Sequence, residues 1–187
     1  MHGSRWRREE TGTSRHCRTG AGASRRPYIS LATRRIEYAA CTSNPDGGWT
    51  AQQARNLMIQ LGDDQRFRLL IHDRDSKFGG GFDEVFRSEG VRVIRTPVRA
   101  PNANAYAERW VRTARADCLD HLLIFGRRHL ERVLRVYVRH YNGHRPHRAL
   151  GLTPPDRFDD AATAARVPDV RCQDLLGGLI HEYRVAA

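Results

Sequence analysis

The sequence predicts an α/β fold, in which short strands alternate with amphipathic helices that flank a sheet. Strand-like apolar runs occupy residues 27–31, 36–41, 67–71 and 91–94. Apolar residues at helical spacing follow the second, third and fourth of these runs. The chain has 187 residues, which suits one domain, because domains usually hold about 100–200 residues.

The charge is strongly positive and almost wholly carried by arginine. There are 32 Lys+Arg and 21 Asp+Glu residues, a formal net charge of +11, and Lys77 is the single lysine. Arginine suits phosphate because its planar guanidinium binds two oxygens at once and is weakly hydrated. We expect a polyanionic partner, and nucleic acid is the abundant one. A basic solvated surface is the alternative.

No segment has the composition of a membrane helix, since no apolar run approaches about 18 residues. Arg5, Arg7 and Arg8 are followed by Glu9 and Glu10 rather than by an apolar stretch, which argues against a secretory signal. We therefore expect a cytoplasmic protein with no membrane partner.

The cysteines and histidines do not show the spacing of a zinc site. No C-x2-C pair occurs, so we expect free thiols rather than a zinc cluster or a disulfide framework. The cysteines are Cys17, Cys41, Cys118 and Cys172. The histidines that invite a zinc site are His72, His140, His144 and His147. They lack cysteine partners, and we expect the histidines after residue 139 to position DNA or to pack on the core.

Three segments differ in composition. Residues 1–26 hold seven arginines and two glutamates, a net charge of +5, and few hydrophobic residues. This segment cannot build a core, so we expect it to be disordered and outside the fold. Residues 27–160 carry the strand and helix patterns and form the expected domain. Residues 161–187 are the expected C-terminal tail, with a last short strand at 175–180.

A hairpin is expected at the start of the domain, with the turn Ala32-Thr33-Arg34-Arg35 between its strands. Turn-forming residues 44–48 then precede Thr50-x-x-Gln53, a capping-box pattern that predicts a helix start. This helix ends at Gly62. Its apolar face consists of Ala54, Leu57, Met58 and Leu61.

The strand at 67–71 leads into the polar pair His72-Asp73. In α/β sheets, sites lie at the carboxyl ends of strands, which is where Asp73 falls. A short helix at 82–88 and Gly90 connect this strand to the next one.

Two longer helices are predicted at 104–121 and 128–141. Both have apolar stripes, and Trp110 and Tyr137 on these stripes are expected in the core. Arginines occupy the other side of the second helix: Arg127, Arg128, Arg132, Arg135 and Arg139.

Asp73 and Glu108 are candidate metal ligands. Two carboxylates can hold Mg²⁺, which otherwise keeps water or phosphate oxygens. Two such ions would serve an in-line attack on a phosphodiester. Arg112 and Arg115 share a helix face with Glu108, since helical residues advance by about 100°, and could hold the flanking DNA backbone. The alternatives are solvated carboxylates and an i,i+4 Glu–Arg pair worth about 0.2–0.5 kcal/mol.

Three ordered motifs carry a family resemblance. They are HDRDSKF at residues 72–78, RTPVRAPNANAYAERW at 95–110 and YNGHRPHRALGLTP at 141–154. Together they resemble the integrase catalytic core of bacterial insertion-sequence transposases, which is related to retroviral integrases. The resemblance covers roughly residues 27–187.

The resemblance implies an RNase H-like fold with a mixed sheet, and an Asp-Asp-Glu triad that cleaves and joins DNA strands with Mg²⁺ or Mn²⁺. Asp73 takes the place of the second Asp and Glu108 that of the Glu. Asp75 has a weaker claim, because it can simply cap the turn that follows it. The implied partners are DNA, as element ends and target, and further copies in a homo-oligomer. We expect DNA phosphate contacts from Lys77, Arg109, Arg112 and Arg115.

The resemblance fails at the start of the chain. Family members open with a central strand that bears the first Asp, and residues 1–26 contain neither an Asp nor such a strand. Glu9 and Glu10 lie near the expected position, but their neighbours are not strand-like. Edges that lose this strand would leave backbone groups unpaired, at about 1–3 kcal/mol each. We expect an N-terminally truncated, inactive polynucleotidyl transferase core; a non-catalytic DNA-binding module and a functionless remnant are the alternatives.

Overall fold

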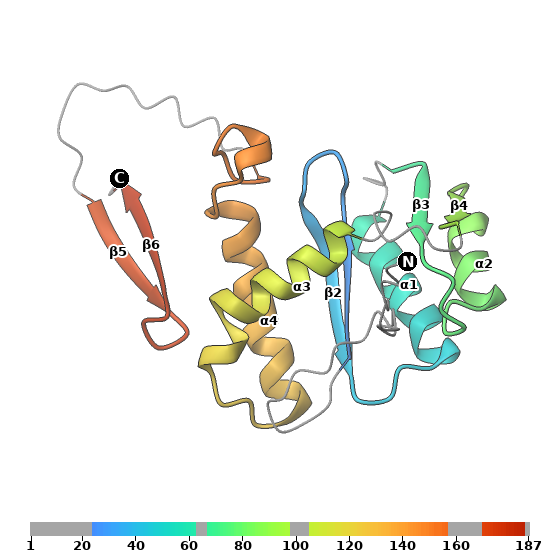
Figure 1. Cartoon of the computed structure of the whole chain (residues 1–187), viewed down its shortest axis with the longest axis horizontal. Coiled ribbons are helices and arrows are strands. Elements are labelled where there is room, and N and C mark those ends of the chain that lie inside the picture. The colour runs from blue at the N-terminus through green and yellow to red at the C-terminus, as the bar shows by residue number, and fades with distance from the viewer. Residues whose placement is uncertain (1–23, 63–66, 98–104, 157–169, 186–187) are drawn as a thin grey trace, which may run out of the picture.

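The computed structural model describes residues 24–62, 67–97, 105–156 and 170–185, and within them strands and helices alternate, which confirms the α/β class (Figure 1). The strands are β1 Ser24–Ile29, β2 Ile36–Thr42, β3 Leu69–His72, β4 Arg92–Arg95, β5 Val170–Leu175 and β6 Ile180–Val185. The helices are α1 Gly47–Leu61, α2 Gly80–Ser88, α3 Ala105–Asp117 and α4 Gly126–Gly143, with 3-10 turns η3 Leu119–His121 and η4 Arg148–Leu150.

The first hairpin begins earlier than the sequence predicts. β1 starts at Ser24 and pairs with β2 from Ser24↔Thr42 to Ile29↔Ile36, so it includes Arg25 and Arg26 from the segment expected outside the fold. Pro27 lies inside β1. A proline is tolerated there because β1 pairs on one side only in the described residues, as prolines in sheets require.

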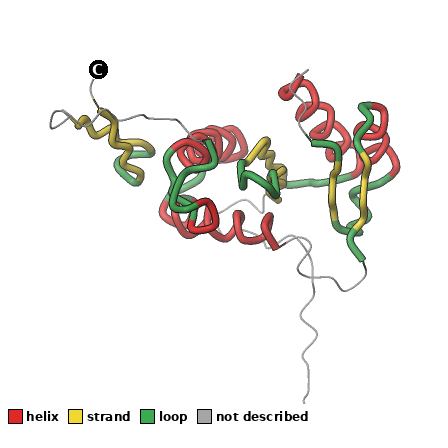
Figure 2. Tube along the Cα trace, turned by 90° about the horizontal axis from the view of Figure 1, so that it is seen from above, coloured by secondary structure: helices red, strands yellow, loops and turns green. Residues whose placement is uncertain are grey.

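This hairpin lies between α3 and α4 on one side and α1 and α2 on the other (Figures 1 and 2), and a hydrophobic core packs on each of its faces. The register shift between Tyr28 and Ile29 interrupts the side-chain alternation, so Ile36 and Tyr38 contact different cores. Ile36 and Cys41 face the larger core under α3 and α4, whereas Tyr28 and Tyr38 face a smaller core under α1 and α2. The smaller core consists of Ala54, Leu57, Phe82, Phe86 and Val91. The larger core adds Trp110 and Tyr137, each 1% exposed, which confirms both as core residues, with others from α3, α4 and β6.

Helix α1 begins earlier than its capping-box pattern predicts. The N-cap is Asp46, whose Oδ1 accepts a hydrogen bond from the Trp49 backbone N–H at 2.7 Å. The predicted cap at Thr50 is wrong, because Thr50 is buried inside the helix. The helix end at Gly62 is confirmed, with φ 53°, a conformation that glycine adopts without a steric penalty.

Strands β3 and β4 are parallel, in the register Leu69↔Arg92 to His72↔Arg95, with α2 between them in the chain. In the described part of the chain, β3 pairs with β4 alone and β1 with β2 alone. The strands therefore form separate pairs rather than the single mixed sheet that the family resemblance implies.

Helix α4 is confirmed as amphipathic, and its five arginines are all exposed on the side away from the core. Near its end, the buried amide of Asn142 binds both backbone groups of Ile36: Oδ1 accepts the N–H and Nδ2 donates to the carbonyl oxygen, each at 2.9 Å. This pair of hydrogen bonds fixes α4 against β2. The loop after α4 packs on the core too, with His147 edge-on to Tyr141 at 4.7 Å between ring centroids.

The C-terminal residues form a hairpin, β5–β6, rather than the single strand predicted at 175–180. Residues 176–179 make the turn, with Leu176, Gly177 and Gly178 at positive φ. The prediction is wrong because the Leu-Leu-Gly-Gly-Leu run supplies turn conformations rather than a continuous strand. Ile180 is buried in the larger core, which docks the inner face of the hairpin beside α4.

Within the ranges described above, no helix is both long and apolar enough to cross a membrane.

Candidate active site

A polar pocket lies at the carboxyl end of β3, where the sequence predicts a site. It encloses a volume of about 440 Å³. Its lining residues are Asp73, Arg74, Asp75, Ser76, Phe78, Gly79, Gly80 and Arg95. Asp73 follows β3 directly, and Arg95 closes β4, so the pocket sits where two parallel strands end.

Asp75 shapes the loop that forms the pocket floor. Its Oδ1 accepts the backbone N–H of Lys77 at 3.1 Å, and its carbonyl oxygen accepts that of Phe78 at 2.9 Å. This confirms the turn-capping role that is the alternative for Asp75. Asp73 contributes to the same loop, since its Oδ1 accepts the backbone N–H of Asp75 at 3.2 Å.

The other carboxylate oxygen of Asp75 faces two cations. Arg26 donates to Oδ2 at 3.1 Å, and Lys77 Nζ lies 3.6 Å from the same atom. The Arg26 guanidinium also stacks on Phe78, 4.7 Å from the ring centroid. Burial favours a higher pKa for Asp75, but these hydrogen bonds and charges outweigh it and lower the pKa. Asp75 is therefore an ionised structural carboxylate beside the pocket.

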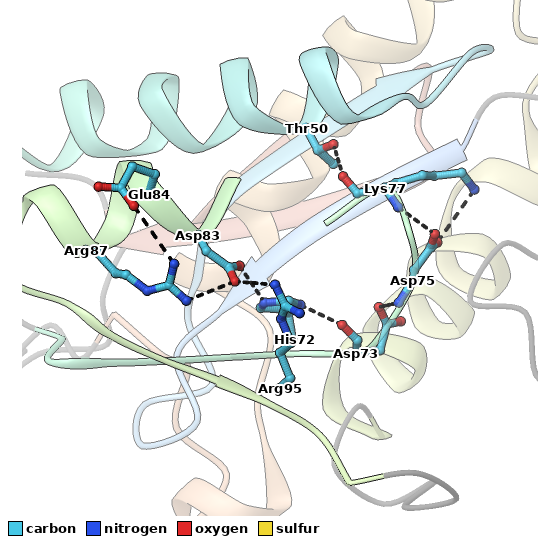
Figure 3. A network of polar contacts seen from close by, with 9 residues as sticks. All are labelled: Thr50, His72, Asp73, Asp75, Lys77, Asp83, Glu84, Arg87 and Arg95. Carbon is cyan, nitrogen blue, oxygen red and sulfur yellow. Dashed lines mark hydrogen bonds and ion pairs between the residues drawn. The ribbon is translucent and has the colours of Figure 1, made fainter. Parts of the chain in front are cut away.

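Helix α1 anchors this loop from outside. Thr50 Oγ1 donates to the carbonyl oxygen of Lys77 at 2.7 Å, and Thr50 itself is fully buried (Figure 3). Lys77, predicted as a DNA contact, thus has its backbone fixed to α1 and its ammonium group at Asp75.

A buried carboxylate ties the two strand ends to α2. Asp83 is 0% exposed, and its Oδ2 accepts from Arg95 at 2.7 Å and from Arg87 at 3.2 Å (Figure 3). Its Oδ1 lies 2.9 Å from His72 Nε2, while His72 Nδ1 lies 2.6 Å from the carbonyl oxygen of Asp73. Both ring nitrogens of His72 therefore lie within hydrogen-bond distance of an oxygen, one on α2 and one on the loop after β3. The network holds the backbone of Asp73 in place.

Glu108 lies on another element. It is exposed in the first turn of α3, and it is not among the residues that line the pocket. Arg109 and Arg112 are exposed on the same helix, and Arg115 forms an ion pair with Asp120 at 3.2 Å. The structure therefore gathers Asp73 and Asp75 at the pocket, with Lys77 beside Asp75, and keeps Glu108 with the three arginines on α3.

One contact connects the hairpin turn with the start of α3. Arg34, at a strained φ of 64°, lies over the ring of Tyr106 at 3.9 Å and donates to its hydroxyl at 3.1 Å. Tyr106 is two residues before Glu108 in the first turn of α3. Sequence reasoning misses Arg34, Arg26 and Asp83, because their partners come from distant elements and no local pattern marks them.

The donor set fits a hard divalent ion in part. Carboxylate oxygens at Asp73 and Glu108 are the ligands that Mg²⁺ and Mn²⁺ take. Asp75 does not fit, because one of its oxygens holds the turn and the other faces Arg26 and Lys77. One oxygen of Asp73 also accepts a backbone N–H, and Glu108 lies on another element, so a metal site shared by Asp73 and Glu108 stays a prediction.

The histidines near the end of α4 and in the loop after it have structural partners. His140 Nδ1 and His144 Nε2 lie 3.2 and 3.3 Å from the two carboxylate oxygens of Glu182, which is 2% exposed. Burial and the nearby charge of Arg145 lower the pKa of His147. These contacts join β6 to α4 and pack the following loop on the core.

The chain was compared with solved structures, with curated proteins and with family models. The chain is similar to the catalytic core domain of BIV integrase in a crystal structure, with 16% sequence identity over 77% of this chain and 91% of that chain and a TM-score of 0.46. No curated protein matches the chain. Residues 89–155 match the family described as "Integrase core domain", a segment that holds Glu108, all of α3 and α4, and the motif at 141–154.

Proposed function

We propose that this chain is an integrase-type catalytic core, of the kind that acts on DNA in the integration and transposition of bacterial insertion sequences, and that it is itself inactive in strand transfer. The match of residues 89–155 to the integrase core domain carries the proposal. The family implies a DNA substrate and dependence on a divalent metal ion. A cytoplasmic location and a homo-oligomer are parts of the same proposal.

Helix α3 is the proposed DNA contact. Arg109 and Arg112 are exposed and follow Glu108, and Arg112 and Arg115 share its helix face. Guanidinium groups that neutralise phosphates release counterions, so each contact makes binding more sensitive to salt. Lys77 would add a cation at the pocket, where it already lies near Asp75.

Asp73 and Glu108 would hold Mg²⁺ or Mn²⁺. When bound, such an ion activates the attacking oxygen and stabilises the leaving one in phosphoryl transfer. The chain contributes the positioning: His72 and Asp83 fix the backbone of Asp73, and Arg34 packs on Tyr106 in the turn that carries Glu108.

Two features of the chain favour DNA binding without strand transfer. Residues 1–45 of the printed sequence contain no Asp that could join Asp73 and Glu108 at a metal site. Arg26, on β1, donates a hydrogen bond to the Asp75 carboxylate at 3.1 Å. It therefore places a fixed cation beside Asp75. We propose that this integrase-type core binds DNA and does not join strands; a non-catalytic DNA-binding module and a functionless remnant are the alternatives.

DNA binding is tested by measuring affinity for duplex DNA over a series of salt concentrations. We expect a steep loss of affinity with salt, and Arg112→Ala should reduce the slope of log K against log salt by about 0.9, the value for one phosphate contact. Arg55→Ala is the matched control, because Arg55 is an exposed arginine on α1 and should leave the slope unchanged. A flat salt dependence in the wild-type protein would contradict the proposal.

Catalysis and metal binding are tested separately. A strand-transfer assay with Mg²⁺ or Mn²⁺ on terminal-repeat DNA should give no joined product, and robust joining would refute inactivity. Mn²⁺ binding should weaken in Asp73→Asn and in Glu108→Gln. Glu84→Gln, an exposed carboxylate on α2, is the control that should bind as the wild type does.

A further inference from the structure

The outer face of the C-terminal hairpin carries four chemically active side chains. β5 and β6 pair in the register Cys172↔Tyr183 and Asp174↔His181. Directly paired residues of an antiparallel ribbon point to the same face, and residues two apart on one strand do so as well. Ile180 and Glu182 are buried on the inner face against the larger core and α4, whereas Cys172, Asp174 and His181 on the outer face are exposed.

Three of these side chains bring ligand atoms together. The Cys172 Sγ, an Asp174 carboxylate oxygen and a His181 ring nitrogen all lie within 4.8 Å of one another. Asp174 Oδ1 lies 3.6 Å from Cys172 Sγ and 2.6 Å from His181 Nδ1. In the described part of the chain, this is the one group of three or more such residues close enough to share an ion.

The distances suit tetrahedral coordination. Zinc binds sulfur at about 2.3 Å and nitrogen or oxygen at about 2.0–2.2 Å, so tetrahedral ligand atoms lie about 3.3–3.6 Å apart. The sulfur–oxygen pair already has this separation. The Asp174–His181 pair would have to open by about 0.7 Å, which small side-chain rotations allow, because both side chains are at least half exposed.

We propose that Cys172, Asp174 and His181 form a binding site for a divalent ion of the zinc class, with solvent completing the coordination. Thiolate and imidazole ligands select zinc-like ions over Mg²⁺ or Mn²⁺, which distinguishes this site from the carboxylates at Asp73 and Glu108. The site revises the expectation from sequence spacing, in which no zinc site is present. The register of the hairpin, which spacing cannot show, makes the site.

The protonation states of the ligands are compatible with the site. Hydrogen bonds from His181 and Cys172 lower the pKa of Asp174, so its carboxylate is ionised at neutral pH. Cys172 is exposed; slight desolvation by its neighbours, with the hydrogen bond and charge of Asp174, raises the pKa of its thiol. An ion would therefore displace the thiol proton on binding, and affinity should rise with pH.

An ion in this place would join the two strands of the hairpin. A two-stranded ribbon is marginally stable alone, and among the residues that the structure describes, this ribbon packs on the core through its inner face. A link between Cys172 and His181 on the outer face would close the ribbon near its turn.

The full-length protein can be titrated with Co²⁺, a spectroscopic substitute for zinc, under a reductant without thiols. We expect a sulfur-to-cobalt charge-transfer band in the near ultraviolet that Zn²⁺ abolishes by displacement. Cys172→Ser should lose the band. His181→Gln should weaken Co²⁺ binding by at least about 10-fold, since loss of a mere second-shell partner already costs about 10–100-fold.

Two controls locate the site. Cys17→Ser changes a cysteine outside the described residues, and Asp73→Asn changes the polar pocket at the end of β3. Both variants should keep the charge-transfer band and bind Co²⁺ with wild-type affinity. The absence of a charge-transfer band in the wild type, or its persistence in Cys172→Ser, would overturn the proposal. Neither result bears on DNA binding, so the two proposals fail separately.

Discussion

Two buried carboxylates in this molecule have similar partners and different tasks. Asp83 is 0% exposed and faces His72, Arg87 and Arg95. Glu182 is 2% exposed and faces two histidines and an arginine, His140, His144 and Arg184.

The difference between them lies in what each carboxylate connects. Asp83 joins α2 to the ends of β3 and β4, next to the pocket. It thereby fixes the backbone of Asp73 through His72. Glu182 joins a hairpin at the end of the chain to α4, which is already held on β2 by Asn142. One carboxylate is part of the site, and the other is a docking contact.

The largest effect is expected from Asp83→Ala. Removing one partner of a fully buried ion pair costs about 3–5 kcal/mol, but Arg87 and Arg95 are about half exposed and remain solvated, so we expect about 2–3 kcal/mol. Urea unfolding measures the loss. Glu84→Ala, the neighbouring carboxylate with a 73% exposed side chain, should change stability by less than about 0.5 kcal/mol. Equal effects of the two variants would show that burial of Asp83 does not matter.

Asn142→Ala tests a neutral contact between α4 and β2. The variant leaves the N–H and carbonyl of Ile36 buried without partners, and we expect a loss of about 2 kcal/mol in the free energy of unfolding. Asn142→Asp keeps the acceptor for the N–H but loses the donor to the carbonyl oxygen. A variant that unfolds at the wild-type urea concentration would contradict the role of this amide.

Glu182→Ala should cost less globally, about 1 kcal/mol, because His140, His144 and Arg184 are all partly exposed and regain water. Its main effect should be local. Hydrogen exchange of residues 170–185 should accelerate, while amides of β3 and β4 keep their protection. Accelerated exchange at β3 would contradict the division between a site carboxylate and a docking carboxylate.

The sequence predicts the elements well where one helix face decides the outcome. The apolar stripe of α4, the helix end at Gly62 and the placement of Asp73 after a strand all follow from local patterns. Cap and turn positions are less well predicted, as Asp46 in place of Thr50 shows. Local patterns do not show which of two suitable polar residues the folded chain uses.

The roles of buried polar residues could not be predicted. Asp83 occurs in the first turn of a short helix, where an acidic residue is ordinary and exposed. Only the packing of α2 on β3 and β4 buries it beside Arg95. Cys172 and His181 are nine positions apart in the sequence, and only the register of the β5–β6 hairpin brings them together. The candidate site was predicted at Asp73, and its relation to Glu108 stays a prediction.

The smallest difference is expected in the response of stability to acid. Burial favours a higher pKa for Asp83, but the hydrogen bond from Arg95 and the charge of His72 outweigh it and lower the pKa. A carboxyl with a lowered pKa in the fold stabilises the protein above the pKa of the unfolded chain, about 3.9 for Asp. That contribution is lost as the pH falls through the folded value, because the unfolded chain binds the proton first.

Asp83→Asn has no carboxyl to protonate at this position. Its free energy of unfolding should therefore fall less than that of the wild type when the pH is lowered from about 5 to about 2. Urea unfolding at a series of pH values measures both slopes, and Glu84→Gln should keep the wild-type slope, since its carboxylate is exposed. If the free energy of unfolding depends on pH in the same way for Asp83→Asn and the wild type, protonation of other carboxylates, such as Asp75, accounts for the acid sensitivity.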